Sequence, residues 1–192
     1  VQDAGCRLGA GPMSARPEDD PLLAGFRRYR AREDPAARGR RVTQAKRGQR
    51  PHTAVVTCSD ARLDPQALFD AGPGELFVIR NMGGLVPTYA PDGGCHGTSA
   101  ALEYAVKILR VRRIVILGHA DCDAVNAMLH GPLREARDFV LPWMDIAEPV
   151  LWPIPDPAPD ETLETAVERA VVRLSLDNLR TFPWIAAREA DG

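Results

Sequence analysis

Short apolar runs alternate with amphipathic segments along most of this chain. Three runs have the length and the β-branched content of buried strands: residues 53–57 (TAVVT), 76–80 (LFVIR) and 113–118 (RIVILG). Apolar residues at helical spacing mark the segments 98–110 and 161–182 as amphipathic helices. This alternation predicts an α/β fold with a mainly parallel β-sheet core flanked by helices.

Weaker signals complete the expected secondary structure. Residues 21–36 and 65–69 have the pattern of further helices. Thr98 or Ser99 is placed to cap the helix that follows them. The proline-rich stretch 149–159 predicts an extended crossover and not a helix.

Length and composition indicate one domain. The chain has 192 residues, a net charge of −2 and no apolar run of the roughly 18 residues that a membrane span needs. Residues 1–20 are rich in Gly, Pro and charge, which predicts a disordered extension before a single domain over residues 21–192. Because the net charge is only −2, we expect no nucleic-acid or membrane partner. Because no apolar leader is evident, we expect a cytoplasmic location.

Residues with reactive side chains gather where two of the predicted strands end. Cys58, Asp60 and Arg62 follow the first strand in the stretch CSDAR, and His119 and Cys122 follow the third in HADC. Because the carboxyl ends of parallel strands meet at one sheet edge, these side chains can converge there. Thiolate and imidazole are ligands that zinc prefers, and three such ligands with an open fourth position are typical of a catalytic zinc site.

Asp60 has two alternative roles at such a site. Its carboxylate can accept a hydrogen bond from a water molecule at the metal and orient it. It can also occupy the fourth ligand position itself, in a closed state. A bidentate pair with Arg62 would hold Asp60 off the metal. The sequence leaves both states open.

Three longer stretches carry a resemblance to a known family. CSDAR, GELFVIRNMGGLVP and GTSAALEYAVKILRVRRIVILGHADC resemble the β-class carbonic anhydrases. The resemblance implies a zinc enzyme that hydrates carbon dioxide to bicarbonate and a proton. It also implies a four-stranded parallel sheet with a further edge strand, and a homodimer or higher homo-oligomer with its site at the subunit interface. By position, Cys58, His119 and Cys122 match the zinc ligands, and Asp60 and Arg62 match the catalytic pair.

The same resemblance implies substrate-binding residues. Gln49 matches a glutamine that donates a hydrogen bond to the substrate in some members of the family. Phe77, Met82 and Tyr104 fall where the family lines its apolar substrate pocket. From spacing alone, these last three residues are more simply interpreted as ordinary core residues.

Two features depart from the family pattern. The family usually continues the second zinc cysteine with Gly-Gly, whereas this chain has Asp123 and Ala124. The bulk and charge of Asp123 lie near a site that must release an anion, so we expect zinc binding with lowered activity. The chain also stops before the usual C-terminal edge strand, which leaves one edge of the expected sheet uncovered.

Two alternatives to a carbonic anhydrase stay open, and these departures favour the first of them. One is a catalytically weak or silent zinc-binding homologue with a structural or interaction role. Another is a hydrolase of a related small substrate, such as carbonyl sulfide or carbon disulfide. The adjacent Asp60 and Arg62 favour the carbonic anhydrase, because a silent protein has no evident need for this pair.

Overall fold

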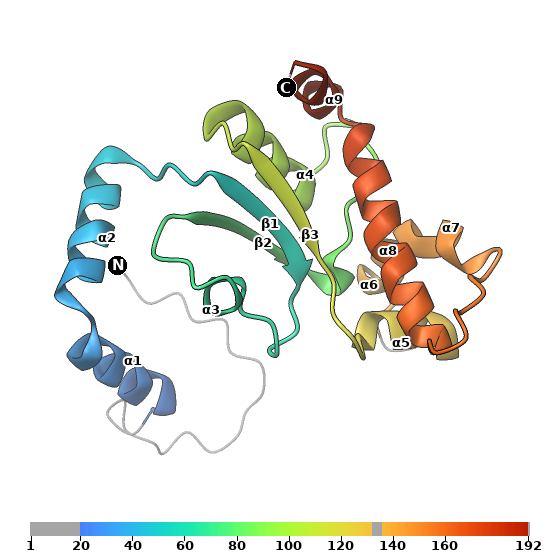
Figure 1. Cartoon of the computed structure of the whole chain (residues 1–192), viewed down its shortest axis with the longest axis horizontal. Coiled ribbons are helices and arrows are strands. Elements are labelled where there is room, and N and C mark those ends of the chain that lie inside the picture. Colours follow the sequence, from blue (N-terminus) through green and yellow to red (C-terminus); the bar gives the residue numbers. More distant parts are fainter. Residues whose placement is uncertain (1–19, 132–135, 192) are drawn as a thin grey trace. The chain divides into compact units, whose positions relative to one another are not determined.

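The computed structural model describes residues 20–131 and 136–191 (Figure 1). The chain divides into two compact units, Val1–Val42 and Thr43–Gly192. Among the described residues, the clusters of buried apolar side chains lie in the second unit. The extension predicted for residues 1–20 lies outside the described residues, apart from Asp20, and the single domain over 21–192 stays a prediction.

Two helices account for the described part of the chain before the sheet. Helix α1 (Pro21–Arg32) begins at Asp20, whose carboxylate accepts hydrogen bonds from the first-turn backbone. Helix α2 (Pro35–Arg47) begins in the same way at Asp34. The helix predicted over residues 21–36 is therefore two helices, because a proline with an acidic cap before it starts a new helix. Neither helix has a buried side chain.

Three parallel strands form the sheet of the second unit, in the order β2-β1-β3. They are β1 (Thr53–Cys58), β2 (Leu76–Asn81) and β3 (Arg113–Leu117). The central strand β1 is buried after its first residue, and its last residue Cys58 pairs with Asn81. The predicted parallel sheet is confirmed. The described residues form three of the strands that the resemblance implies.

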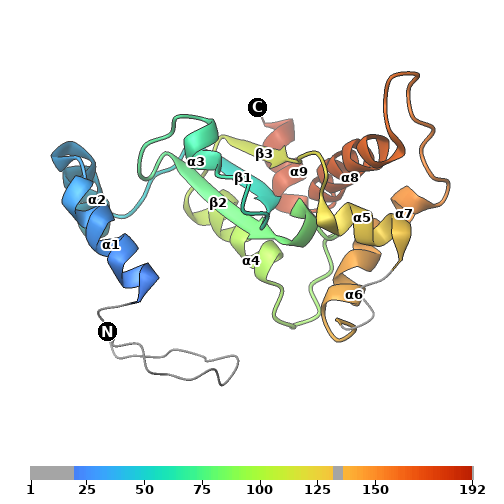
Figure 2. The same ribbon diagram turned by 90° about the horizontal axis from the view of Figure 1, so that it is seen from below.

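Helices flank this sheet on both sides (Figures 1 and 2). They are α3 (Pro65–Leu68), α4 (Gly97–Glu103), α5 (Asp123–His130), α6 (Val140–Met144), α7 (Glu148–Leu151), α8 (Leu163–Arg180) and α9 (Pro183–Ala190). Helix α4 continues as a wider π-helical turn, Tyr104–Ile108, and short 3₁₀ turns occur at Met82–Gly84 and Asp145–Ala147.

Two local predictions were wrong. Helix α7 includes residues 149–151, the beginning of the stretch predicted to be extended. The helix can form there because Pro149 stands in its first turn, where proline is tolerated. The second wrong prediction is the cap of α4. This helix begins at Gly97 without a side-chain cap, and the Thr98 hydroxyl is instead buried and paired with the Asn81 side chain at 3.1 Å.

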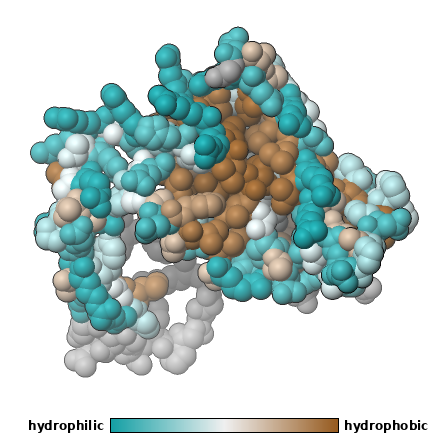
Figure 3. All heavy atoms as spheres, viewed as in Figure 1, coloured by the Kyte–Doolittle hydropathy of each residue, from teal (hydrophilic) through white to brown (hydrophobic). Residues whose placement is uncertain are grey.

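The strand β3 lies at the outer side of the sheet, and its side chains are half-buried or exposed. A groove of about 770 Å³ runs beside it, with Ile114, Leu179 and Ile185 among its lining residues. Apolar side chains gather on this face (Figure 3).

None of the helices in the described ranges combines the length and the apolar character that crossing a membrane requires.

One tight backbone contact supports the carboxyl edge of the sheet. Gly84 has a φ of +63°, and a Cβ added there would lie 3.2 Å from the Cys58 nitrogen. An alanine at this position must adopt a left-handed backbone and also displace the end of β1. Gly84 therefore allows the turn after β2 to pack directly on the strand that ends in Cys58.

Replacing Gly84 with alanine is expected to lower the free energy of unfolding by about 2 kcal/mol. Denaturant unfolding at equilibrium measures this loss. Gly97→Ala is the matched control, because nothing lies within 4 Å of a Cβ built at Gly97. Equal stability of the two variants would contradict the role given to Gly84.

Candidate metal centre

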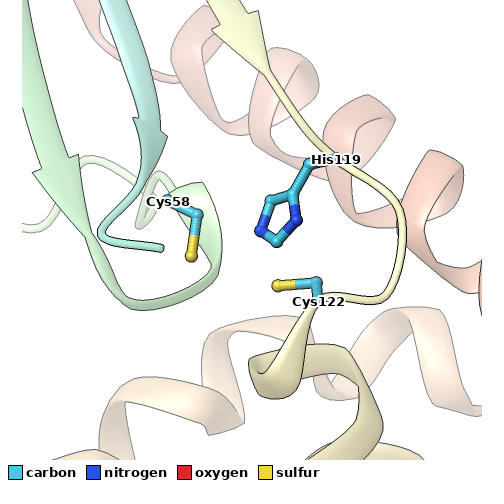
Figure 4. Close-up of side chains that lie close together, drawn as sticks. All are labelled: Cys58, His119 and Cys122. Atoms are coloured by element: carbon cyan, nitrogen blue, oxygen red, sulfur yellow. The ribbon is translucent and has the colours of Figure 1, made fainter. Parts of the chain in front are cut away.

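The carboxyl ends of β1 and β3 bring three ligand side chains together. Cys58 ends β1, His119 follows β3, and Cys122 directly precedes α5. One ligand atom from each residue lies within 4.8 Å of the other two. The imidazole points between the two sulfur atoms (Figure 4). The convergence that the sequence predicts is therefore present in the folded chain.

The imidazole of His119 presents a free nitrogen to this cluster. Its Nδ1 lies 2.9 Å from the Ala120 carbonyl oxygen, which only accepts hydrogen bonds. Nδ1 therefore carries the proton and donates it, and Nε2 keeps its lone pair. Nε2 is buried and has no hydrogen-bond partner among the described residues. A buried histidine nitrogen without a hydrogen-bond partner is expected where that nitrogen serves as a metal ligand.

The two thiols complete a donor set that suits zinc. Cys58 and Cys122 are 6% and 4% exposed, and neither forms a disulfide. Burial, and to a lesser extent the nearby Cys58, raise the pKa of Cys122 to about 11 against two opposing backbone hydrogen bonds. A divalent cation would reverse this effect, because it stabilises thiolates strongly. Two sulfurs and one imidazole nitrogen at a buried sheet edge fit Zn²⁺.

Asp60 lies beside this cluster and is held there by Arg62. The guanidinium donates from Nε to Oδ1 at 3.0 Å and from Nη2 to Oδ2 at 2.8 Å. The Arg62 backbone N–H adds a third bond to Oδ1 at 2.8 Å. These bonds from Arg62 hold the pKa of Asp60 well below its usual range, and the pKa of Arg62 is raised in return. Asp60 Oδ2 is 4.0 Å from His119 Nε2.

This pairing bears on the two roles open to Asp60. Both of its carboxylate oxygens accept hydrogen bonds from Arg62, and Asp60 is not one of the three grouped ligands. The arrangement in the structure is thus the one in which Arg62 keeps the carboxylate next to the ligand cluster and out of it.

Sequence reasoning missed a second arginine at this edge. Arg80, near the end of β2, donates to the Cys58 carbonyl at 3.2 Å and to the Asp60 carbonyl at 2.6 Å. It therefore fixes the backbone of the turn that carries both side chains. Arg80 is hard to place from the sequence, because its nearness to Cys58 depends on the register of the sheet. That register pairs Cys58 with Asn81, the residue after Arg80.

The residues predicted to bind substrate fall into two groups. Met82 follows directly after Asn81, which pairs with Cys58, so it lies at the metal edge. Phe77 pairs with Ala54, four positions before Cys58, and its ring centroid lies 6.0 Å from that of the half-exposed Tyr104. A strand rises by about 3.3 Å per residue, so this aromatic pair lies about 13 Å from Cys58 along the strand direction.

Gln49 lies still further from the metal edge of its own chain. It is exposed and precedes β1, so it stands at the amino end of the strand whose carboxyl end carries Cys58. Of the predicted substrate-binding residues, Met82 alone thus lies at the sheet edge that carries the cluster. The roles of Gln49, Phe77 and Tyr104 stay predictions.

Asp123 occupies the first turn of α5 and is exposed. It is close enough to Arg62 to help raise the pKa of that guanidinium. Its carboxylate therefore adds negative charge at the edge that carries the ligand cluster, while it also stabilises the amino end of α5.

Asp123→Gly is expected to raise kcat by up to about fivefold, the effect of roughly 1 kcal/mol from one exposed charge. Asp123→Asn removes the charge and keeps the bulk, so a comparison of the two variants separates these effects. Stopped-flow carbon dioxide hydration measures kcat. An unchanged kcat in both variants would exclude Asp123 as a cause of lowered activity.

Comparison with protein families gives a match over most of the chain. The family model described as carbonic anhydrase matches residues 53–192. A carbonic anhydrase from Pseudomonas aeruginosa is 37% identical over 169 residues, which are 86% of this chain and 74% of that protein. One from Synechococcus elongatus is 33% identical over 175 residues, or 89% of this chain. The chain spans 63% of the length of this second relative.

Solved structures give the same result for the fold. The structure of the β-carbonic anhydrase CcaA matches with a TM-score of 0.80 and 30% identity, over 89% of this chain and 84% of that one. A Coccomyxa β-carbonic anhydrase in complex with acetazolamide matches with a TM-score of 0.65 and 26% identity, over 90% of this chain and 76% of that one.

Proposed function

The chain belongs to the β-class carbonic anhydrase family, and we propose that it catalyses the reversible hydration of carbon dioxide to bicarbonate and a proton. Zinc is the cofactor, and Cys58, His119 and Cys122 would hold it. The observation that carries the proposal is the convergence of these three ligands beside a carboxylate that Arg62 holds in place.

Zinc supplies a Lewis acid that lowers the pKa of water and so provides a nucleophile for carbon dioxide. The chain's own residues orient that nucleophile. Because Arg62 keeps the pKa of Asp60 low, Asp60 is an anion at neutral pH and accepts hydrogen bonds without donating them. A water molecule that donates to Asp60 would keep its oxygen lone pairs turned away from the carboxylate and free to attack a substrate. Carbon dioxide is uncharged, and the apolar side chain of Met82 at this edge suits it.

We propose a homodimer or higher homo-oligomer as the active form. Gln49, Phe77 and Tyr104 lie away from the ligand cluster within one chain. If they contact substrate, a second copy must supply them. Tetrameric β-carbonic anhydrases are known from Sordaria macrospora, a match that supports the fold alone at 24% identity. A cytoplasmic location would keep Cys58 and Cys122 reduced for metal binding.

The Asp60–Arg62 pair also argues against a silent zinc protein. A structural site needs only its ligands, yet here three hydrogen bonds hold a carboxylate next to the cluster. Hydrolysis of carbonyl sulfide or carbon disulfide would use the same residues, and direct comparison of the three substrates distinguishes these activities.

The test is zinc content followed by stopped-flow hydration of carbon dioxide from about pH 6.5 to about pH 9. We expect one zinc per chain and a rate that rises toward alkaline pH, because two thiolates cancel the metal charge and leave water less acidic than at a three-histidine site. Asp60 stays ionised over this range, so its titration does not shape the profile. One zinc per chain with no hydration at any pH would refute the proposal.

A further inference from the structure

Glu168 is the one carboxylate on the buried face of α8, whose other buried residues are apolar or uncharged. It is 8% exposed, and its neighbours along this face, Val167 and Val171, pack in the same core cluster as Cys58 and Cys122. Placing a carboxylate in such surroundings is costly unless hydrogen bonds compensate. Within the described ranges, no lysine or arginine forms an ion pair with Glu168. Its burial therefore needs another explanation.

The partner of this carboxylate is the backbone of a metal ligand. Glu168 Oε1 accepts a hydrogen bond from the Cys122 N–H at 3.0 Å, in buried surroundings and across 46 residues of sequence. Cys122 is the residue that precedes the first turn of α5. In a capping box, the third residue of the helix reaches back to accept this N–H. Here that residue is Val125, whose side chain cannot accept a hydrogen bond. Glu168 provides the acceptor from α8 instead.

The loop that leads into Cys122 has a backbone conformation that its own residues do not favour. Asp121 has a φ of +53°, a left-handed conformation that residues other than glycine adopt at a cost. Arg62 donates from Nη2 to the Asp121 carbonyl at 2.8 Å and so holds the middle of the loop. Glu168 holds its end, one residue later, where the backbone sets the direction of the Cys122 side chain. Hydrogen bonds behind metal ligands commonly fix ligand geometry in this way.

We propose that Glu168 is a positioning residue of the metal centre, which orients Cys122 toward Cys58 and His119 through its hydrogen bond to the Cys122 N–H. The proposal rests on the zinc centre of the proposed function. It assigns to Glu168 no contact with substrate.

The test measures affinity for Zn²⁺ alone, by competition with a chromophoric chelator, in the full chain. Glu168→Ala is expected to bind zinc about 10- to 100-fold more weakly than the unchanged chain. Glu168→Gln keeps an oxygen acceptor of the same reach, so it is expected to stay within about threefold. The matched control is Glu164→Ala on the same helix, because the Glu164 carboxylate pairs at 3.4 Å with His130, at the opposite end of α5 from Cys122.

Cobalt substitution adds a readout that a general loss of stability would not change. In Co²⁺-loaded protein, the visible and thiolate charge-transfer bands report the ligand geometry. We expect them to shift in Glu168→Ala and to be retained in Glu168→Gln and Glu164→Ala. If Glu168→Ala does not fold, Glu168→Asp carries the same comparison, because its shorter side chain withdraws the carboxylate from Cys122.

Three results would overturn this role. The first is wild-type zinc affinity and an unchanged cobalt spectrum in folded Glu168→Ala. The second is an equal loss of affinity in Glu168→Gln, which would assign the effect to charge and not to the hydrogen bond. The third is an equal loss in Glu164→Ala. Failure of the unchanged chain to bind zinc would instead refute the proposed function itself.

Discussion

Zinc affinity of the metal-free protein is expected to rise at least about tenfold for each unit of pH between about pH 6 and about pH 8. The reason is the buried thiol of Cys122, whose pKa is raised to about 11. At neutral pH this thiol keeps its proton, and zinc binds thiolate. Each zinc bound must therefore release that proton, and binding is favoured as the proton concentration falls.

Chelator competition at several pH values measures this slope, and calorimetry in two buffers of different ionisation enthalpy counts the protons released. Cys122→Ser should bind zinc far more weakly and with a shallower slope, because one ligand and one proton are lost. Cys95→Ser is the matched control, because Cys95 is an exposed thiol outside the ligand cluster. A zinc affinity that does not depend on pH would contradict a buried thiol at the site.

Much of this centre could be predicted from sequence because its parts are local. Cys58, Asp60 and Arg62 lie within five consecutive residues, and a strand end places all three. His119 and Cys122 likewise share one loop after a later buried run. The remaining step, that the two strand ends are neighbours, follows from the general geometry of parallel sheets. The direct pairing of β1 with β3 confirms it.

The missing parts depend on contacts between distant segments. Glu168 reads in sequence as a charged residue of an amphipathic helix, and only the packing of α8 reveals that it is buried against Cys122. Thr98 looked like a helix cap because its hydroxyl is free in the local sequence, yet Asn81 uses that hydroxyl in the folded chain. For Thr98, a tertiary hydrogen bond thus replaces the local cap that propensity favours.

Replacing Asp60 with asparagine is expected to lower kcat/KM by about 100-fold while zinc stays bound. Asparagine keeps the shape of the side chain, but it presents one acceptor and one donor in place of two acceptors. It therefore loses at least one of the three Arg62 bonds and cannot orient water as a carboxylate does. Stopped-flow hydration and zinc content are measured together. Asp70→Asn is the control, because Asp70 is exposed and asparagine tolerates its φ of +48°.

The structure further predicts that Asp60 and Arg62 act as one unit. Arg62→Ala removes both guanidinium bonds and leaves the backbone N–H bond to Oδ1, so the pKa of Asp60 rises toward its usual range and Oδ2 is free to turn toward the ligand cluster. We expect a loss of activity in Arg62→Ala similar to that in Asp60→Asn, with zinc retained. The double variant should then lose little more than either single one, because each change already removes the same oriented carboxylate. Multiplicative losses would mean that the two side chains contribute separately, and that the hydrogen bond from Arg62 to the Asp121 carbonyl matters for activity in its own right.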